Sequence, residues 1–219
     1  HHIALFFRLR GATAPLLGPG QHWVLADSDA GLLARARVAA PVGVSVELQI
    51  ADLACGTRAL LAPAPDLVTA SAFFDLCGAA WIERFADDLA AAGAALHAVL
   101  SYDGRELWLP AAPQDAAALA AFHADQRRDK GLGPALGPDA HAHLARCLAG
   151  HGYRVDDAPS DWVLTPPQDA ALIAALAEGS AAAIAGALGA EAAGAWLAAH
   201  RQAARVVIGH RDLLALPPG

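Results

Sequence analysis

The sequence predicts an α/β fold in which helices cover both faces of a mostly parallel sheet. Two observations lead to this prediction. Short apolar segments of strand type alternate with segments of helical spacing along most of the chain, and several of the strand segments end at an acidic or hydroxyl residue. The chain has 219 residues, of which 56% are hydrophobic. It can therefore bury the core of a single domain over residues 1–219.

The first half of the chain predicts alternating strands and helices. Residues 3–20 contain an apolar piece and then a helix-like segment that ends in a Gly-Pro-Gly turn. Farther along, the predicted strands are 22–27, 44–50 and 66–70, and the predicted helices are 29–39 and 73–92. Asp29 is placed to cap the first of these helices, and Gly93 ends the second.

The second half predicts more strands and a long helical insert. The predicted strands are 94–102, 107–110, 153–156, 162–165, 205–209 and 212–216, and the predicted helices are 113–129 and 139–150. The turn residues Asp103 and Gly104 separate the first two strands, and Asp139 is expected to cap the second helix. A helical insert over 167–204 precedes the last strand or hairpin. This Ala- and Gly-rich insert could form a lid or a homodimer surface, and packing in the core explains its composition equally well.

Composition and charge exclude several classes of function. The net charge of −7 argues against a nucleic acid or an anionic membrane as the main partner. Cys55, Cys77 and Cys147 form no CxxC pair, which is typical of a reducing cytoplasm, and the histidines lack metal-site spacing. The most apolar tract, 181–199, is interrupted by Glu191 and predicts a helix of a cytoplasmic protein rather than a membrane span.

Polar residues at the ends of three predicted strands indicate a cofactor site. The strand over 22–27 ends at Asp27, and a helix pattern starts at once. A carboxylate at the tip of a buried strand can accept both hydroxyls of a ribose. The next two strands end near Asp52 and Ser71. The pattern predicts a nucleotide-type cofactor across the carboxyl ends of a parallel sheet.

These motifs resemble those of the class I S-adenosylmethionine-dependent methyltransferases that act on small molecules. The resemblance rests on LADSD at 25–29, IADLA at 50–54 and DLVTASAFFD at 66–75, with SYDGRELWLP at 101–110 and the stretch 123–144 farther along. It implies a Rossmann-like sheet of seven strands, mostly parallel, whose last strand is antiparallel to the rest. The family has a glycine-rich loop after its first strand, and here only Gly11 stands in that region.

The resemblance also implies which residues hold the cofactor. Asp27 and the adjacent Ser28 would bind the ribose of S-adenosylmethionine. Asp52 would accept from the adenine amine and Leu53 would pack on the ring, although Asp52 could equally be an ordinary loop carboxylate. Ala70 and Ser71 would lie beneath the methionine portion.

The acceptor site is expected beyond the fourth and fifth strands. The predicted substrate-binding residues are Phe73, Tyr102, His123 and Arg127. Candidates for a general base are His123, Asp75 and Tyr102, and the sequence does not decide among them. Ordinary structural roles compete with each assignment: His123 could be an exposed helix histidine, and Arg127 could belong to a charge cluster with Asp125.

The predicted function is methyl transfer from S-adenosylmethionine to a small molecule. An NAD(P)-dependent oxidoreductase is an alternative, because a ribose-binding carboxylate serves that cofactor too. No Tyr-x-x-x-Lys pair supports the alternative. A non-catalytic binding module of the same fold is a further alternative, which rests on the scarcity of glycine near Gly11.

Overall fold

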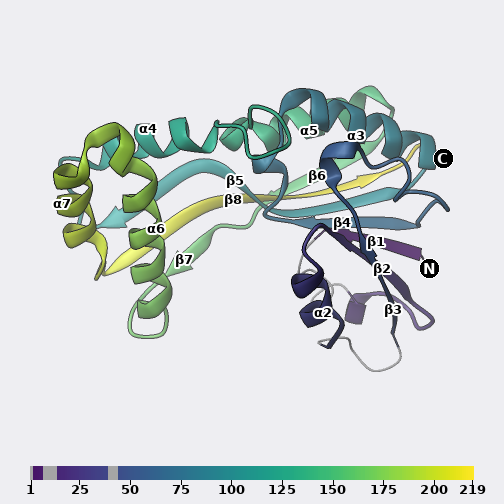
Figure 1. Cartoon of the computed structure of the whole chain (residues 1–219), viewed down its shortest axis with the longest axis horizontal. Coiled ribbons are helices and arrows are strands. Elements are labelled where there is room, and N and C mark those ends of the chain that lie inside the picture. The colour runs from purple at the N-terminus through teal and green to yellow at the C-terminus, as the bar shows by residue number, and fades with distance from the viewer. Residues whose placement is uncertain (1, 7–13, 39–43) are drawn as a thin grey trace.

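The computed structural model describes residues 2–6, 14–38 and 44–219 (Figure 1). Its helices are α2 (Ala30–Val38), α3 (Ala79–Ala92), α4 (Asp115–Gln126), α5 (Ala140–Gly150), α6 (Ala170–Leu188) and α7 (Ala190–His200). Its strands are β1 (His2–Phe6), β2 (His22–Asp27), β3 (Ser45–Ile50), β4 (Leu67–Ser71), β5 (Ala95–Leu109), β6 (Arg154–Pro159), β7 (Trp162–Leu164) and β8 (Arg205–Leu216). Gly11, the one glycine expected near the cofactor loop, lies outside the described residues.

Within this described part, eight strands form one mixed sheet in the order β3-β2-β1-β4-β5-β8-β6, with β7 pairing to β8 as well. The first five strands of that order pair in parallel. The predicted seven-stranded sheet is therefore corrected in its number of strands, because the short strand β7 is added. The last strand, β8, pairs antiparallel with β5, β6 and β7, as the resemblance implies.

Helices pack on both faces of the sheet, as predicted. Alternation along β2 shows this, because neighbouring side chains of a strand point to opposite faces. The side chains of β2 therefore belong to two core clusters. Trp23 and Leu25 pack with Leu33 of α2, whereas Ala26 belongs to the cluster that contains Phe85 of α3. Helices α3 and α5 lie along one face of the sheet in Figure 1, and α2 lies on the other.

Helix α3 shows why the sequence pattern was informative. Trp81, Ile82, Phe85 and Leu89 recur at helical spacing, and all four are buried in the core against the sheet and α5. Gly93 follows in the left-handed conformation with φ of 64°, and its amide donates to the carbonyls of the last turn. This is the end that Gly93 predicts, because glycine adopts positive φ without steric cost.

Two strands that the sequence divides are continuous in the structure. The predicted pairs 94–102 with 107–110, and 205–209 with 212–216, are the single strands β5 and β8. Three residues, 103–105, lie between the pairs that Tyr102 makes with His210 and Glu106 makes with Ile208. The turn residues Asp103 and Gly104 therefore form a bulge rather than a turn, because the ladder to β8 resumes beyond them.

A second bulge lies nearer the start of β5. Val99 and Leu100 stand opposite Asp212 alone, and Leu100 has φ of 55°. The Asp212 carboxylate accepts the Leu100 amide at 2.8 Å and the Ser160 hydroxyl at 2.6 Å. The side chain of Asp212 thus satisfies a backbone donor that the bulge removes from the ladder.

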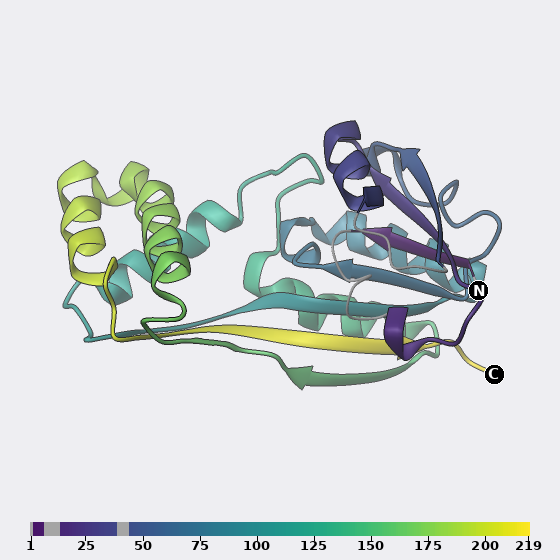
Figure 2. The same cartoon turned by 90° about the horizontal axis from the view of Figure 1, so that it is seen from below.

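The long strands β5 and β8 extend beyond the rest of the sheet and support a helical lobe. Figures 1 and 2 show α4, α6 and α7 gathered at this extended end. Their shared core contains Trp108 from β5, Ile173 and Ile184 from α6, Trp196 from α7 and Val206 from β8. Within the described residues, α6 alone is long and apolar enough to span a bilayer, by length and composition only. Its buried residues pack in this core, so we describe it as a helix of the lobe.

Candidate active site

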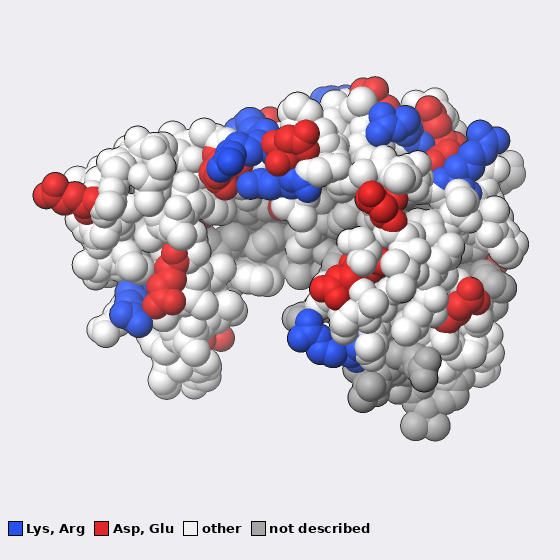
Figure 3. Space-filling view, viewed as in Figure 1, with Lys and Arg blue, Asp and Glu red and all other residues white. Residues whose placement is uncertain are grey.

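The carboxyl ends of the parallel strands meet beside the helical lobe. Chain order reverses at β1, since β2 and β3 lie to one side of it and β4 and β5 lie to the other. Open α/β sheets bind ligands at such a reversal, outside the carboxyl ends of the strands. The space-filling view in Figure 3 shows the molecule hollowed between the helical lobe and the part that contains α2.

Asp27 lies at the tip of β2 and is only 9% exposed. Its Oδ1 accepts the Asp29 amide at 2.8 Å, and its Oδ2 accepts no hydrogen bond from the described residues. Asp29 itself caps α2 by accepting the amides of Gly31 and Leu32 at 2.7 and 3.1 Å. The capping role is therefore filled by Asp29, as predicted, and one oxygen of Asp27 is left for a ligand. The neighbouring Ser28 is exposed.

Asp52 lies next to Asp27 across the edge of the sheet. The Ala51 amide donates to the Asp27 carbonyl at 3.0 Å, which brings the two strand ends together. Asp52 is exposed and caps a short 3₁₀ helix by accepting the Ala54 amide at 2.9 Å. Leu53 is half-buried against the core, and its carbonyl accepts the Trp81 indole at 2.8 Å. A contact of either residue with adenine stays a prediction.

The end of β4 is held in an unusual backbone conformation. Ala70 is 1% exposed, and Ser71 pairs with Val99 of β5. The next residue, Ala72, has φ of 49° and donates its amide to the Val99 carbonyl at 3.0 Å. A left-handed alanine costs conformational energy, and such strain is concentrated at functional sites. The predicted cofactor residues Ala70 and Ser71 thus adjoin a strained turn.

Asp75 follows this turn and is the most perturbed carboxyl group of the site. Burial raises its pKa from 3.8 to about 6, although a backbone hydrogen bond opposes the shift. Its Oδ1 is buried and has no hydrogen-bond partner among the described residues. Its charge also acts on Tyr102, whose phenol it helps to keep protonated. A half-buried carboxyl group whose Oδ1 accepts no hydrogen bond from the described residues, and whose pKa is near 6, can accept a proton from a ligand.

The structure brings together Tyr102 and His123, two of the predicted acceptor-site residues, and their contact with a substrate stays a prediction. The Tyr102 hydroxyl donates to Glu106 Oε1 at 2.8 Å and lies 3.0 Å from His123 Nε2. Burial, followed by the negative charge of Glu106, raises the pKa of Tyr102 far above its usual value. Tyr102 therefore stays protonated and cannot serve as the base. Burial lowers the pKa of His123, so its imidazole is neutral near pH 7.

Arg127 is exposed and already paired. Its guanidinium donates to Asp139 at 2.8 Å, and 46% of the Arg127 side chain is exposed. Asp139 precedes α5 but makes no side-chain cap, because its carboxylate is directed to Arg127 instead. The adjoining Lys130 pairs with Asp125 at 3.3 Å. Arg127 therefore pairs with Asp139 rather than with Asp125, and a substrate contact of Arg127 stays a prediction.

Phe73 lies away from solvent within the main core. It is 6% exposed and packs edge-on against Phe74 and Trp81, with ring centroids 5.5 and 5.4 Å apart. Its position directly after the strained turn keeps it near the predicted acceptor site. A contact between this ring and a substrate stays a prediction.

Glu106 is the residue that sequence reasoning missed. It accepts from the Tyr102 hydroxyl through Oε1 and from the Trp108 indole through Oε2 at 2.9 Å. The signal was present in Glu-Leu-Trp, where alternate residues of a strand share a face. It was obscured because the bulge at 103–105 changes the spacing between Tyr102 and Glu106. Among the described residues, no three His, Cys, Asp or Glu side chains are grouped to hold a metal ion.

Comparison with known proteins identifies the fold. No protein-family model and no curated protein matches the sequence. The structure is similar to a cyclopropane-fatty-acyl-phospholipid synthase-like protein from Lactobacillus casei, with a TM-score of 0.57 and 13% identity over 96% of this chain and 83% of that one. It is also similar to a putative methyltransferase from Bacillus halodurans, with a TM-score of 0.53 and 12% identity over 100% of this chain and 92% of that one. The predicted resemblance to methyltransferases is confirmed as a likeness of fold.

Proposed function

We propose that the protein transfers a methyl group from S-adenosylmethionine to a small-molecule acceptor. The observation on which this proposal chiefly rests is Asp27, a buried carboxylate at the tip of β2 whose Oδ2 accepts no hydrogen bond from the described residues. It lies beside the point where strand order reverses, in a fold shared with a putative methyltransferase.

The residues at the strand ends fit the polar groups of this cofactor. The unoccupied oxygen of Asp27 suits a ribose hydroxyl, and the exposed Ser28 and Asp52 extend the polar edge toward the base. The small side chains of Ala70 and Ser71 leave room for the amino-acid portion. When bound, the cofactor would supply a methyl group on a sulfonium sulfur, which is activated for in-line displacement. The chain would then mainly orient the acceptor and exclude water.

We assign Asp75 as the group that accepts the acceptor's proton. His123 is neutral near pH 7, but its Nε2 is engaged with the Tyr102 hydroxyl at 3.0 Å. Asp75 Oδ1 has no partner among the described residues, and its pKa of about 6 suits proton transfer near neutral pH. His123 and Tyr102 would position the acceptor beside it.

An NAD(P)-dependent oxidoreductase is the competing proposal that Asp27 itself allows. A carboxylate at this strand end also suits the ribose of a dinucleotide. A non-catalytic module that binds one of these nucleotides is a third candidate. Binding of S-adenosylhomocysteine or of NADH distinguishes the methyltransferase from the oxidoreductase. Catalytic turnover distinguishes either enzyme from the non-catalytic module.

The test is a thermal-shift titration with S-adenosylhomocysteine, with NADH in parallel. A dose-dependent rise in Tm with S-adenosylhomocysteine alone is expected, because a ligand that binds only the folded state stabilises it by mass action. Asp27→Asn should weaken this binding at least tenfold, since a hydrogen bond to a charged acceptor contributes about 1.5–3 kcal/mol and each 1.4 kcal/mol is about a factor of ten. Asp29→Asn is the matched control, because asparagine retains the cap of α2.

The outcomes separate the candidates. A rise with NADH alone would replace the methyltransferase proposal with the oxidoreductase. No shift with either ligand would contradict both. Equal weakening by Asp27→Asn and Asp29→Asn would show that Asp27 has no special part in binding.

A further inference from the structure

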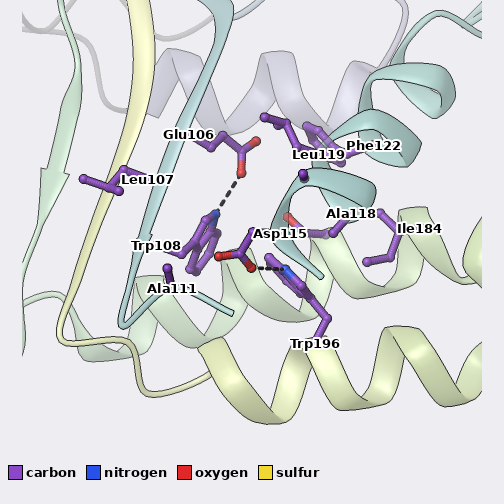
Figure 4. A pocket seen from close by; sticks show the side chains of 12 residues that line it. Glu106, Leu107, Trp108, Ala111, Asp115, Ala118, Leu119, Phe122, Ile184 and Trp196 are labelled. Carbon is purple, nitrogen blue, oxygen red and sulfur yellow. Dashed lines mark hydrogen bonds between the residues drawn. The ribbon is translucent and has the colours of Figure 1, made fainter. Parts of the chain in front are cut away.

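The helical lobe contains a pocket of about 270 Å³, apart from the candidate active site at the strand ends (Figure 4). It lies between the end of β5 and the helices α4, α6 and α7. Trp108 and Trp196 form two of its walls, with ring centroids 5.2 Å apart and planes at 75°. Phe122, Leu119 and Ile184 complete an apolar lining. Two indoles at right angles present both a ring face and a ring edge to a ligand.

The charged groups in this lining are all acidic. Glu106 and Asp115 line the pocket, and no Lys or Arg does so among the described residues. Figure 4 shows Glu106 bonded to Trp108 and Asp115 bonded to Trp196. Each carboxylate thus holds one of the indoles in place. Asp115 also lies 2.6 Å from Nε2 of the fully buried His200, which leaves Glu106 as the carboxylate with fewer partners in the lobe.

The pocket adjoins the candidate acceptor site. Glu106 lines the pocket and accepts the Tyr102 hydroxyl at 2.8 Å. Phe122 also lines it, and its ring packs edge-on against Tyr102 with centroids 6.0 Å apart. His123 follows Phe122 on α4 and contacts the same hydroxyl. A ligand in the pocket would therefore end next to the residues that we place around the acceptor.

We propose that this pocket binds an organic cation, namely the ammonium group of the methyl acceptor together with the apolar ring that carries it. The assignment to the acceptor rests on the proposed methyl transfer, whereas the assignment of a cation rests on the pocket itself. Ammonium groups are attracted to the faces of indole rings, most strongly when water is excluded. The charge of Glu106 adds to this attraction, and an anionic ligand would be repelled by both carboxylates.

The size of the pocket limits the ligand to a compact group. Drug-sized ligands occupy clefts of roughly 300–1,000 Å³, so about 270 Å³ suits one ring with a short arm. The apolar lining favours burial of the ring, and Glu106 at the end toward Tyr102 favours an amine there. We infer that the acceptor is a small aromatic or cycloalkyl amine. It would bind as the ammonium ion and pass one proton to Asp75, after which its nitrogen would form the bond to the methyl carbon as the bond from sulfur breaks and S-adenosylhomocysteine leaves.

The probes for this proposal are three molecules of one shape and different charge. They are 2-phenylethylamine, 2-phenylethanol and 3-phenylpropionate, each titrated by calorimetry at pH 7.5 against the full chain without cofactor. We expect the amine to bind at least tenfold more tightly than the alcohol, since the cation–π attraction and one carboxylate contribute about 1.4 kcal/mol or more. We expect the carboxylate to show no binding.

Variants locate the site. Glu106→Gln removes a charge and keeps the shape, so the affinity for the amine should fall about tenfold while that for the alcohol stays the same. Trp196→Phe should weaken both ligands. Trp162→Phe is the matched control, because Trp162 on β7 packs against His210 and lies outside the pocket lining.

Each result decides one part of the proposal. Equal affinity for amine and alcohol would overturn the cation assignment. If the amine does not bind, or if Glu106→Gln leaves its affinity unchanged, the assignment of this pocket as the amine-binding site would be overturned. The titration needs no cofactor, so it is independent of the S-adenosylhomocysteine shift. Amine binding without that shift would retain the pocket and reject the methyl acceptor as its ligand.

Discussion

At the scale of single residues, burial decides the chemistry more than residue type does. Asp75 and Asp29 both lie in the first turn after a strand, where an acidic residue is ordinary. Asp29 is exposed and caps α2. Asp75 is half-buried beside the core residues Phe74 and Cys77, and burial raises its pKa to about 6. The same local signal thus has two outcomes, because desolvation depends on what the rest of the chain places around the carboxyl group.

Replacing Asp75 by Asn should stabilise the protein and lower its activity. A carboxyl group whose pKa is raised on folding contributes stability that is complete below pH 3.8 and is lost as pH rises through about 6. Asp75→Asn should therefore gain about 3 kcal/mol over the native protein above pH 6, and little below pH 4, since one pKa unit corresponds to about 1.4 kcal/mol. Urea unfolding at pH 4 and pH 7 measures the difference.

The control for this prediction is the exposed Asp156, whose Asn variant should be neutral at both pH values. A loss of stability in Asp75→Asn at pH 7 would show that the Asp75 carboxylate is stabilised in the folded state. A fall in kcat that accompanies the gain in stability would support its role as a base.

The two tyrosines of the chain should not ionise in the folded protein. Burial raises the pKa of both Tyr102 and Tyr153. Stability that depends on a raised pKa is present below the unfolded value, near 10, and is lost as pH rises above it. Absorbance at 295 nm should rise only when the protein unfolds in alkali, together with the loss of circular dichroism. A rise near pH 10 with the fold intact would contradict this environment for one of them.

At the scale of elements, the two bulges of β5 position residues of the candidate active site, as the strand ends do. The bulge at 103–105 brings Glu106 back toward Tyr102, and the bulge at Val99 and Leu100 adjoins the strained Ala72. Both require a matching residue on β8. Asp212 satisfies the Leu100 amide, and Gly209 leaves space for the residues opposite it. The long strand β8 is therefore shaped to the irregularities of its neighbour.

Gly209→Ala should destabilise the protein. A Cβ at this position would overlap the Asp103 carboxylate and come within 2.8 Å of Arg105 Cβ. We expect a loss of about 1–3 kcal/mol in the free energy of unfolding, as in other overpacked sites. Gly194→Ala is the control, because it lies inside α7 with open space around it and should gain up to about 1 kcal/mol. Equal effects of the two variants would show that the bulge tolerates a side chain.

At the scale of the whole molecule, β5 and β8 join the half that contains the parallel strands to a helical lobe. The first half holds the strand ends with Asp27 and Asp75, and the lobe holds the pocket of Trp108 and Trp196. Tyr102, on β5, lies between them. A single domain over residues 1–219 remains our proposal, and one cooperative unfolding transition would support it.

The predicted homodimer belongs to this scale as well. Helix α6 keeps Leu172 41% exposed among small side chains, so its outer surface is apolar. We expect sedimentation above the monomer mass of 22.4 kDa, and a shift to the monomer with Leu172→Glu. Leu16→Glu, at a leucine that is 83% exposed elsewhere, should not change the mass. A native protein that sediments as a monomer at every concentration would contradict the prediction.

The sequence by itself determined the alternation of strands and helices and the ends at Asp27 and Gly93. These features depend on periodicity, caps and strand ends, which act over a few residues. Only the tertiary structure decided the continuity of β5 and β8, the burial of Asp75 and the pocket between Glu106 and Trp196. The physical reason is that ladder pairing, desolvation and cavity shape depend on segments far apart in the chain, such as Asp115 and Trp196, which lie 3.0 Å apart through one hydrogen bond.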